Sequence, residues 1–315
     1  MTQTCKVAFV GAGYMATEHV KAFGDIPGVE LSGIFSRTRE RAEKLAAEFG
    51  IKGVYDSVEE LYEKTQADLV VVTVVELSMN KVSRACFAFP WTVLLEKPAG
   101  FNMPDALEIH AAAEQQARKV YVALNRRFYA ATRTALADLA QIDGPRFIKM
   151  QDQQDQATAL QYGQPAKVVA NWMYANSVHM VDYFTAFGRG KVVEVENVFP
   201  WTPDDPGIVV AKLVFDSGDT GLYEGIWKGP GPWAATIQTA AKRWEMRPLE
   251  QASFQVAGSR KLEAVEAHPW DTAFKPGLRL QAEHAVKAAL GQEHESISLD
   301  ESLESMRLVQ RIFGL

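Results

Sequence analysis

Cysteine is scarce in this chain of 315 residues, which contains only Cys5 and Cys86. Cys5 begins an apolar run with strand character and Cys86 falls in a stretch with helical spacing, so neither their number nor their spacing indicates a disulfide framework or a metal site. Such sparse cysteine is typical of proteins in a reducing compartment. We therefore expect a cytoplasmic protein without bound metal.

An excess of positive charge and long apolar runs are also lacking. The 33 basic residues are outnumbered by 39 acidic ones, which gives a formal net charge of −6 and no general attraction to nucleic acid or anionic membranes. Charged residues interrupt every apolar run before it reaches the ~18 residues of a membrane-spanning helix, and the first residues are too few and too polar for a signal sequence. The 47% hydrophobic content is enough for one or two buried cores.

The clearest local pattern is a glycine-rich turn at the end of the first apolar run. Gly11, Gly13 and Ala16 stand at the three spaced positions of the dinucleotide-binding pattern G-x-G-x-x-G/A. Gly11 permits a sharp exit from the strand, Gly13 has no Cβ that would block a pyrophosphate, and a small residue such as Ala16 lets helix and strand pack closely. The pattern also occurs in plain glycine turns, but here it follows a strand, opens a helix and precedes a second strand at 29–35. We therefore expect a dinucleotide cofactor at Gly11, Gly13, Tyr14, Met15 and Ala16.

The order of predicted elements changes near residue 125. Before it, short apolar strands alternate with amphipathic helices, as in a doubly wound parallel sheet, and the continuous apolar run at 69–73 is typical of a strand buried on both faces. After it, strand follows strand with turn signals between them, at 146–151, 192–199, 209–215, 221–226, 234–240 and 253–256. This order favours a large, mainly antiparallel open sheet, interrupted by an apolar helix over 172–187 and closed by helices over 278–290 and 300–313. The sequence thus predicts an α/β Rossmann dinucleotide-binding domain over 1–125 and an α+β substrate-binding and oligomerisation domain over 126–315, with the ligand in the crevice between them.

The residues after the second strand bear on the choice between NAD and NADP. An NAD-binding domain normally has Asp or Glu there to accept hydrogen bonds from ribose hydroxyls. This chain has Ser36, Arg37 and Thr38 instead, and its first carboxylate, Glu40, is expected inside the next helix. Arg37 and Arg41 offer planar donor forks that suit a 2′-phosphate. Two readings stay open: NADP is the preferred cofactor, or the hydroxyls merely cap a helix, the arginines are solvated and NAD is used.

A second motif lies at the end of the fifth strand, where 94–100 reads Leu-Leu-Glu-Lys-Pro-Ala-Gly. Together with the glycine-rich turn and with Asn-Arg-Arg-Phe at 125–128, it closely resembles the glucose-fructose oxidoreductase/inositol dehydrogenase/MocA (Gfo/Idh/MocA) family. The resemblance implies a Rossmann domain followed by an open antiparallel sheet, with Lys97 beside the nicotinamide and Glu96 fixing cofactor or lysine. The competing interpretation is a solvated Glu96–Lys97 ion pair. A strand end that turns into a cleft also favours a cis Lys97–Pro98 bond.

The family's second catalytic signature, Asp-x-Gly-x-His, is only partly kept. Aligned on its histidine, the chain has His179, but Ala175 replaces the aspartate and Ser177 the glycine. The resemblance implies that His179 is the acid/base for the substrate hydroxyl, with Asn176 as a neutral partner, although a lone histidine on an apolar helix is ordinarily a core residue. It also implies that the strand end at Thr73 contacts the cofactor and that the substrate is bound by Arg126, Arg127, Trp172, Asn176 and His179. Trp172 is one of several candidates for a stacking wall, with Tyr174, Trp201, Trp227, Trp233 and Trp270, most of which we expect in the core.

These patterns lead to one expected function and two alternatives. We expect an NAD(P)-dependent oxidoreductase that transfers a hydride between nicotinamide and a secondary alcohol or ketone of a sugar, cyclitol or related polyol. The resemblance also allows a non-catalytic NAD(P)- and sugar-sensing protein on the same fold, to which the Ala175 departure points, or a redox-assisted glycoside hydrolase. The strand at 207–215 carries apolar residues at both parities, which predicts a sheet face that is covered in a homodimer or homotetramer.

Overall fold

The computed structural model describes residues 4–204 and 206–315, which form two compact units. Unit 1 contains the chain up to Asn125 together with Thr272–Leu303, and unit 2 contains Arg126–Asp271 together with Glu304–Leu315. The sequence analysis also placed a boundary after residue 125, but it assigned everything beyond that point to one domain. Residues 272–303 depart from this expectation because they pack with the first unit.

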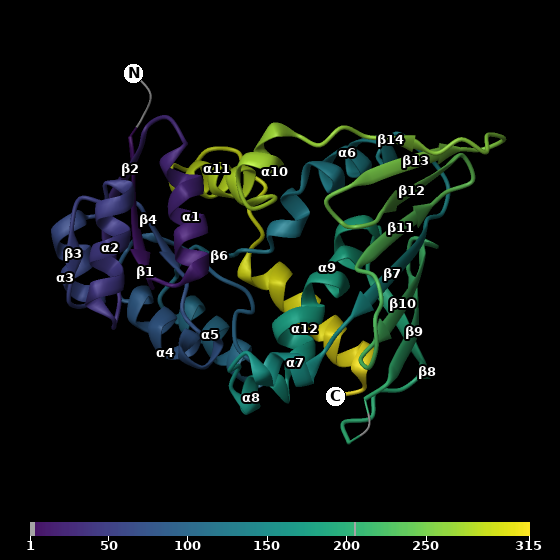
Figure 1. Cartoon of the computed structure of the whole chain (residues 1–315), viewed down its shortest axis with the longest axis horizontal. Coiled ribbons are helices and arrows are strands. Elements are labelled where there is room, and N and C mark those ends of the chain that lie inside the picture. Colours follow the sequence, from purple (N-terminus) through teal and green to yellow (C-terminus); the bar gives the residue numbers. More distant parts are fainter. Residues whose placement is uncertain (1–3, 205) are drawn as a thin grey trace. The chain divides into compact units, whose positions relative to one another are not determined.

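Unit 1 is built on a six-stranded parallel sheet in the order β3-β2-β1-β4-β5-β6 (Figure 1). The strands are β1 (Cys5–Val10), β2 (Val29–Phe35), β3 (Val54–Tyr55), β4 (Leu69–Val72), β5 (Thr92–Leu95) and β6 (Val120–Val122). Strand β4 reads Leu-Val-Val-Val and is buried throughout, the pattern of a strand covered by helices on both faces. The winding direction reverses between β1 and β4, and ligands of such sheets bind outside the carboxyl ends of the strands at this point.

The helices of unit 1 begin and end at residues that the sequence marks. They are α1 (Tyr14–Gly24), α2 (Arg39–Phe49), α3 (Val58–Thr65), α4 (Glu76–Phe87), α5 (Met103–Gln115) and α11 (Leu278–Ala289). The Ser57 hydroxyl accepts a hydrogen bond from the Glu60 N–H at 3.0 Å and caps α3. Asn102 caps α5 in the same way, and α2 ends at Gly50, whose φ of 69° is left-handed.

Helix α11 explains why residues 272–303 belong to unit 1. Leu278 and Ala282 are buried in the same core as Phe23 of α1, and Figure 1 shows α11 beside α1 although the two are far apart in sequence. The Arg279 guanidinium also donates a hydrogen bond to the Asp25 carboxylate at 2.7 Å, just after α1. The C-terminal part of the chain thus returns to complete the core of unit 1.

Unit 2 is built on an eight-stranded sheet in the order β14-β13-β12-β11-β7-β10-β9-β8. The strands are β7 (Phe147–Gln153), β8 (Val192–Phe199), β9 (Ile208–Phe215), β10 (Thr220–Ile226), β11 (Ala234–Gln238), β12 (Lys242–Met246), β13 (Ala252–Val256) and β14 (Glu263–Ala264). Neighbours β7 and β10 run parallel, and the other neighbouring pairs run antiparallel. The expected large, mainly antiparallel sheet is therefore confirmed, with β12 and β14 added to it.

The helices of unit 2 are α6 (Ala130–Leu139), α7 (Gln156–Gln161), α8 (Ala166–Val169) and α9 (Val178–Phe187). The chain passes from one unit to the other within three elements: the 3-10 turn Asn125–Phe128, α10 (Pro269–Ala273) and α12 (Leu299–Phe313). Helix α9 packs on β7 and β11 and buries Tyr183, Phe184 and Phe187. The helix expected over 172–187 is not a single α-helix, because a π-helical turn (Met173–Ser177) precedes α9. Such turns are frequent at functional sites. None of the helices described is long and apolar enough to cross a membrane.

The sheet of unit 2 has apolar residues on both faces, as the sequence predicts. Val209 and Leu213 of β9 are fully buried, whereas Ile208 is 58% exposed and Val210 and Val214 are half-buried. Figure 1 shows α9 on one face of this sheet. Alternate residues of β9 therefore leave apolar side chains on the other face.

Candidate functional site

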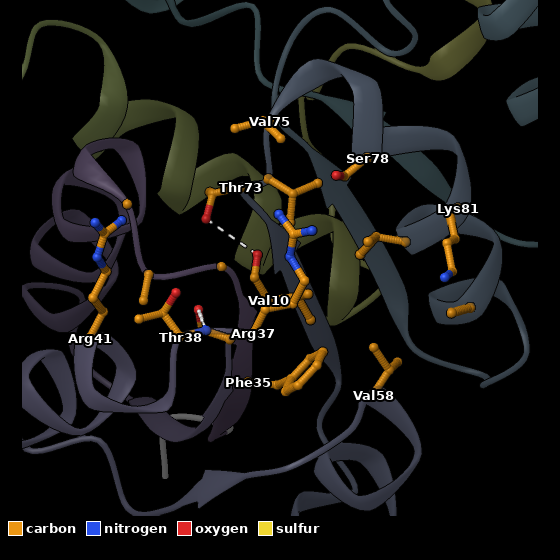
Figure 2. A pocket seen from close by; sticks show the side chains of 17 residues that line it. Val10, Phe35, Arg37, Thr38, Arg41, Val58, Thr73, Val75, Ser78 and Lys81 are labelled. Carbon is orange, nitrogen blue, oxygen red and sulfur yellow. Dashed lines mark hydrogen bonds between the residues drawn. The ribbon is translucent and has the colours of Figure 1, made fainter. Parts of the chain in front are cut away.

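A cavity of about 410 Å³ lies at the carboxyl ends of β1, β2 and β4 in unit 1 (Figure 2). Its size is that of a small-molecule site. It is lined by the glycine-rich turn and Val10, by Phe35, Ser36, Arg37, Thr38 and Arg41, by Val58, by Thr73, Val74 and Val75, and by Ser78, Lys81, Val82 and Ala85 of α4. The structure thus brings together Gly11, Gly13, Ser36, Arg37, Thr38, Arg41 and Thr73, all of which the sequence analysis assigned to the cofactor.

Gly11 is required by the fold around the cavity. Its φ is +111°, and an added Cβ would lie 2.3 Å from the Thr73 carbonyl oxygen. The two strand ends are held together there, since the Thr73 N–H donates a hydrogen bond to the Val10 carbonyl at 2.8 Å. Only glycine combines this conformation with this close approach.

Gly13 differs, because the protein itself leaves space beside it. Its φ of −93° is open to any residue, and an added Cβ would meet no heavy atom within 4 Å. Gly13 is also the N-cap of α1, where no side chain caps the helix and the first turn has no acidic residue. The first N–H groups of α1 and the partial positive charge of its N-terminus are therefore available to an anion such as a pyrophosphate.

The rim of the cavity carries positive charge. Arg37 and Arg41 are exposed cavity residues, and no ion pair to either is found in the described ranges. Figure 2 shows the two side chains on either side of Thr38, Arg41 to its left and Arg37 to its right. Arg39, by contrast, lies outside the cavity and pairs with Glu43 at 2.9 Å and with Asp56. Lys81 is a further cationic lining residue, which we missed because nothing in the α4 sequence marks it.

The hydroxyls beside these arginines do not act as helix caps. Thr38 is the N-cap of α2, but its side chain makes no cap hydrogen bond, and its N–H donates instead to the Ser36 hydroxyl at 3.2 Å. Glu40 is exposed in the first turn of α2 and is not a lining residue. Among the described residues that line the cavity there is thus no carboxylate to bind ribose hydroxyls.

Five other expected cofactor residues do not line this cavity: Tyr14, Met15 and Ala16 on α1, and Glu96 and Lys97 after β5. Ala16 is fully buried and packs in the core of unit 1, which agrees with the helix–strand packing expected at the third position of the pattern. Tyr14 is 67% exposed, and the Lys275 ammonium lies 5.5 Å from its ring centroid. Met15 is partly buried against the core.

Glu96 and Lys97 stand at the end of β5. The Lys97–Pro98 bond is cis, which confirms the prediction. The Glu96 side chain is buried and bonded through both oxygens, to His19 Nε2 at 2.8 Å and to the Lys97 N–H at 3.0 Å. A solvated Glu96 is therefore excluded. His19, on α1, was missed by sequence reasoning. The only signal for it was a histidine on the buried face of the helix that follows the glycine-rich turn.

Arg127 is held within unit 2. Its guanidinium donates to both carboxylate oxygens of buried Asp182, at 2.6 and 2.7 Å, and to the Thr185 hydroxyl at 2.7 Å. Ser305 donates to the same carboxylate at 2.6 Å. This bidentate pair uses Nε and one terminal nitrogen of Arg127, and substrate binding by Arg127 stays a prediction.

Trp172 and Asn176 belong to a buried hydrogen-bond network. The Trp172 indole N–H and the Asn176 amide both donate to Gln154 Oε1, at 2.9 and 2.8 Å. Gln154 Nε2 donates to Asp152 at 2.5 Å, and the Tyr223 hydroxyl donates to the other Asp152 oxygen at 2.7 Å. Burial raises the pKa of the Asp152 carboxyl, although these hydrogen bonds oppose the shift. Sequence reasoning missed Asp152 and Gln154, which no motif marks.

Arg126 and His179 both contact Trp233. The Arg126 guanidinium carbon lies 4.5 Å from the Trp233 ring centroid, and the buried His179 ring lies 6.4 Å from it, centroid to centroid. The Trp233 indole N–H is fixed by the Gln153 carbonyl at 2.7 Å. Two other tryptophans considered for stacking, Trp201 and Trp227, pack instead against Phe313 in the core.

Residues 5–124 match the family model described as "Oxidoreductase family, NAD-binding Rossmann fold" (GFO_IDH_MocA). Among curated relatives, a 4-carboxy-2-hydroxymuconate-6-semialdehyde dehydrogenase from a Sphingobium species is 23% identical over 223 residues, 69% of each chain. A D-apiose dehydrogenase from Paraburkholderia graminis is 25% identical over 123 residues, 39% of this chain and 33% of the relative.

Solved structures share the fold over the whole chain. A dehydrogenase from Chromobacterium violaceum has a TM-score of 0.85 at 18% identity, covering 100% of this chain and 95% of its own. A levoglucosan dehydrogenase in complex with NADH has a TM-score of 0.83 at 15% identity, covering 99% of this chain and 96% of its own. The arrangement of a parallel Rossmann sheet followed by a large mixed sheet is thus common to this chain and these proteins.

Proposed function

We propose that the chain is an NAD(P)-dependent dehydrogenase or reductase of the Gfo/Idh/MocA oxidoreductase family, whose model matches its residues 5–124. It transfers a hydride between nicotinamide and a secondary alcohol or ketone of a sugar, cyclitol or related polyol. The observation that carries the proposal is the cavity at the carboxyl ends of β1, β2 and β4, where Gly13 faces open space at an uncapped helix N-terminus. That chemistry fits the diphosphate of a dinucleotide.

NADP is the preferred cofactor in this proposal. Arg37 and Arg41 line the cavity without carboxylate partners in the described ranges, and Ser36 and Thr38 add hydroxyls beside them. A 2′-phosphate accepts charge-assisted hydrogen bonds from guanidinium groups. In NAD-binding sites the ribose 2′-hydroxyl donates to a carboxylate instead, and none of the described lining residues carries a carboxylate. The cofactor supplies or accepts the hydride, and the chain binds and orients it.

The proposed roles of Lys97 and His179 concern the substrate oxygen and its proton. The Lys97 ammonium donates a hydrogen bond to the reacting oxygen and stabilises the negative charge that develops there. The buried Glu96 carboxylate, held by His19, binds the Lys97 N–H and so fixes the backbone from which this side chain extends. His179 exchanges the proton of the substrate hydroxyl.

A non-catalytic sensor is the second candidate, and the substitution Ala175 for the family aspartate favours it. A single assay separates the two candidates: the absorbance of reduced nicotinamide is followed with NADP(H) and NAD(H) against a panel of sugars, polyols and keto-sugars. The oxidoreductase produces a cofactor- and substrate-dependent change. Sugar and cofactor binding by calorimetry without any turnover would identify the sensor instead.

We also propose that two chains associate through the sheet of unit 2. Ile208 of β9 is 58% exposed, and Phe147 of β7 is 41% exposed, with half-buried Val210 and Val214 on the same strand as Ile208. An apolar face of this kind is stabilised when a second copy covers it. Light scattering at micromolar concentration tests the proposal. A dimer or tetramer is expected, and Ile208→Glu should shift it toward the mass of one chain, whereas a monomeric wild type would contradict it.

A further inference from the structure

We propose that the substrate is a sugar acid or a related hydroxylated carboxylate, whose carboxylate is bound by Arg126. The inference rests on the proposed function and names its substrate class. It starts from a cation in unit 2 that has no anionic partner, close to the proposed proton-exchanging histidine.

Arg126 is held in place without being neutralised. Its guanidinium stacks on Trp233, whose own indole N–H is fixed by the Gln153 carbonyl. Stacking uses the flat face of the guanidinium and leaves the donors at its edge. Arg126 Nε is buried and makes no hydrogen bond, and no ion pair to Arg126 is found in the described part of the chain. A partly buried charge with unused donors is stabilised by an incoming anion.

Three acidic groups whose pKa is lowered by the positive charge of Arg126 do not supply that anion. These groups are Asp152, Tyr129 and Tyr183. Burial raises the pKa of Tyr129 to about 12 and raises that of Tyr183 further, so both phenols stay neutral. Burial also raises the pKa of Asp152, and its two oxygens already accept from Gln154 and Tyr223.

A second feature of unit 2 offers a hydrogen-bond acceptor to the ligand. The Trp172 indole is only a donor, so the Gln154 atom that it meets must be the acceptor oxygen. That oxygen also meets Asn176, which must therefore present its NH₂ group to Gln154. The Asn176 carbonyl oxygen is left as an acceptor with no hydrogen bond recorded from the described residues, and a substrate hydroxyl is the natural donor for it.

The two features together define the ligand class. A guanidinium edge binds a carboxylate or phosphate, and an amide oxygen accepts a hydrogen bond from a hydroxyl. Arg126 and His179 contact the same indole, so the anion is bound near the group proposed to exchange the substrate proton. Sugar acids carry both groups on one small molecule, whereas neutral sugars leave Arg126 without a partner.

Matched pairs of acids and neutral sugars test the inference: glucuronate with glucose, and galacturonate with galactose, each with NADP⁺. At least one acid should be oxidised with a kcat/KM at least about tenfold above that of its neutral partner. Arg126→Gln should lower the value for the acid by about 10- to 100-fold, mainly through KM, and leave the neutral sugar within about twofold. Arg260→Gln is the matched control, because Arg260 is an exposed arginine of the same unit, and it should change neither value.

Four results would overturn the inference. If neutral sugars are oxidised as well as the acids, or if Arg126→Gln lowers both values equally, the proposed hydride transfer stands and the substrate class is wrong. If Arg126→Gln instead weakens NADPH binding and leaves the acids unaffected, the anion that Arg126 binds belongs to the cofactor. If no compound is oxidised, calorimetry with the same acids decides: binding that Arg126→Gln abolishes supports the inference while the proposed reaction fails, and absence of acid binding overturns it.

Discussion

The cofactor preference provides the most detailed prediction, because the chain offers two test residues and a matched control within five positions. Arg37→Ala and Arg41→Ala each remove a guanidinium that lines the cavity, whereas Arg39→Ala removes one that lies outside it and is paired with Glu43 and Asp56. We expect the first two substitutions to weaken NADPH binding and to leave NADH binding nearly unchanged. Arg39→Ala should change neither affinity.

The magnitude follows from the exposure of the two arginines. A hydrogen bond to a charged group contributes about 1.5–3 kcal/mol, and solvent screening at an exposed site reduces it, so we take about 1–2 kcal/mol for each. This corresponds to a 5- to 30-fold loss of NADPH affinity. Titration of the reduced cofactors by fluorescence at fixed ionic strength measures it, together with a wild-type preference for NADPH. Equal affinities for NADPH and NADH in the wild type, or an Arg39→Ala effect as large as that of Arg37→Ala, would refute the reasoning.

Three further predictions concern catalysis and pH. Lys97→Ala should lower turnover about 10²- to 10³-fold with cofactor affinity retained, and near-full turnover would show that Lys97 is misassigned. Asp219→Asn should lower the free energy of unfolding at pH 7 by about 2 kcal/mol, because buried Asp219 accepts hydrogen bonds from the Arg189 side chain and from the Arg146 and Arg189 N–H groups. Burial alone would raise the pKa of Asp219, but these hydrogen bonds lower it. The difference in unfolding free energy between wild type and Asp219→Asn, measured with urea, should therefore shrink as the pH falls through and below about 3.9. A difference that does not change with pH would contradict this prediction. Asp152→Asn should have the opposite pH dependence, because burial raises the pKa of Asp152 in the native state. Wild type therefore loses stability as the pH rises from about 4, whereas the asparagine of the variant does not titrate. The stability of the variant relative to wild type should increase with pH. A pH-independent gap in Tm would contradict this.

The fold could be predicted largely because its elements have clear periodicity and turn signals. Strand β8 (Val192–Phe199) has the expected bounds, and β4 is the expected fully buried strand. Strand β12 (Lys242–Met246) was missed because only Trp244 and Met246 alternate as buried apolar residues among charged neighbours. The return of α11 to unit 1 depends on tertiary packing against α1, which helical spacing cannot reveal.

The residues of the candidate site could also be predicted only in part. Gly11 and Gly13 could be identified because their roles depend on the local turn, and Arg37 because it lies two residues after the end of β2. His19, Asp152 and Gln154 could not, because each has a partner in a distant part of the chain. The Arg127–Asp182 pair could not be predicted either, because Asp182 lies 55 residues away in the sequence.

Direct transfer of isotope from substrate to cofactor tests the central claim most directly. The protein is incubated with NADP⁺ and sugars, polyols and sugar acids that carry deuterium on carbon, and the reduced cofactor is analysed by mass spectrometry. Our account predicts reduced cofactor with one deuterium at the nicotinamide ring, formed by wild type and at least about 10²-fold more slowly by Lys97→Ala. Tight binding of NADPH without any labelled reduced cofactor across the panel, with NAD⁺ as well as NADP⁺, would contradict it.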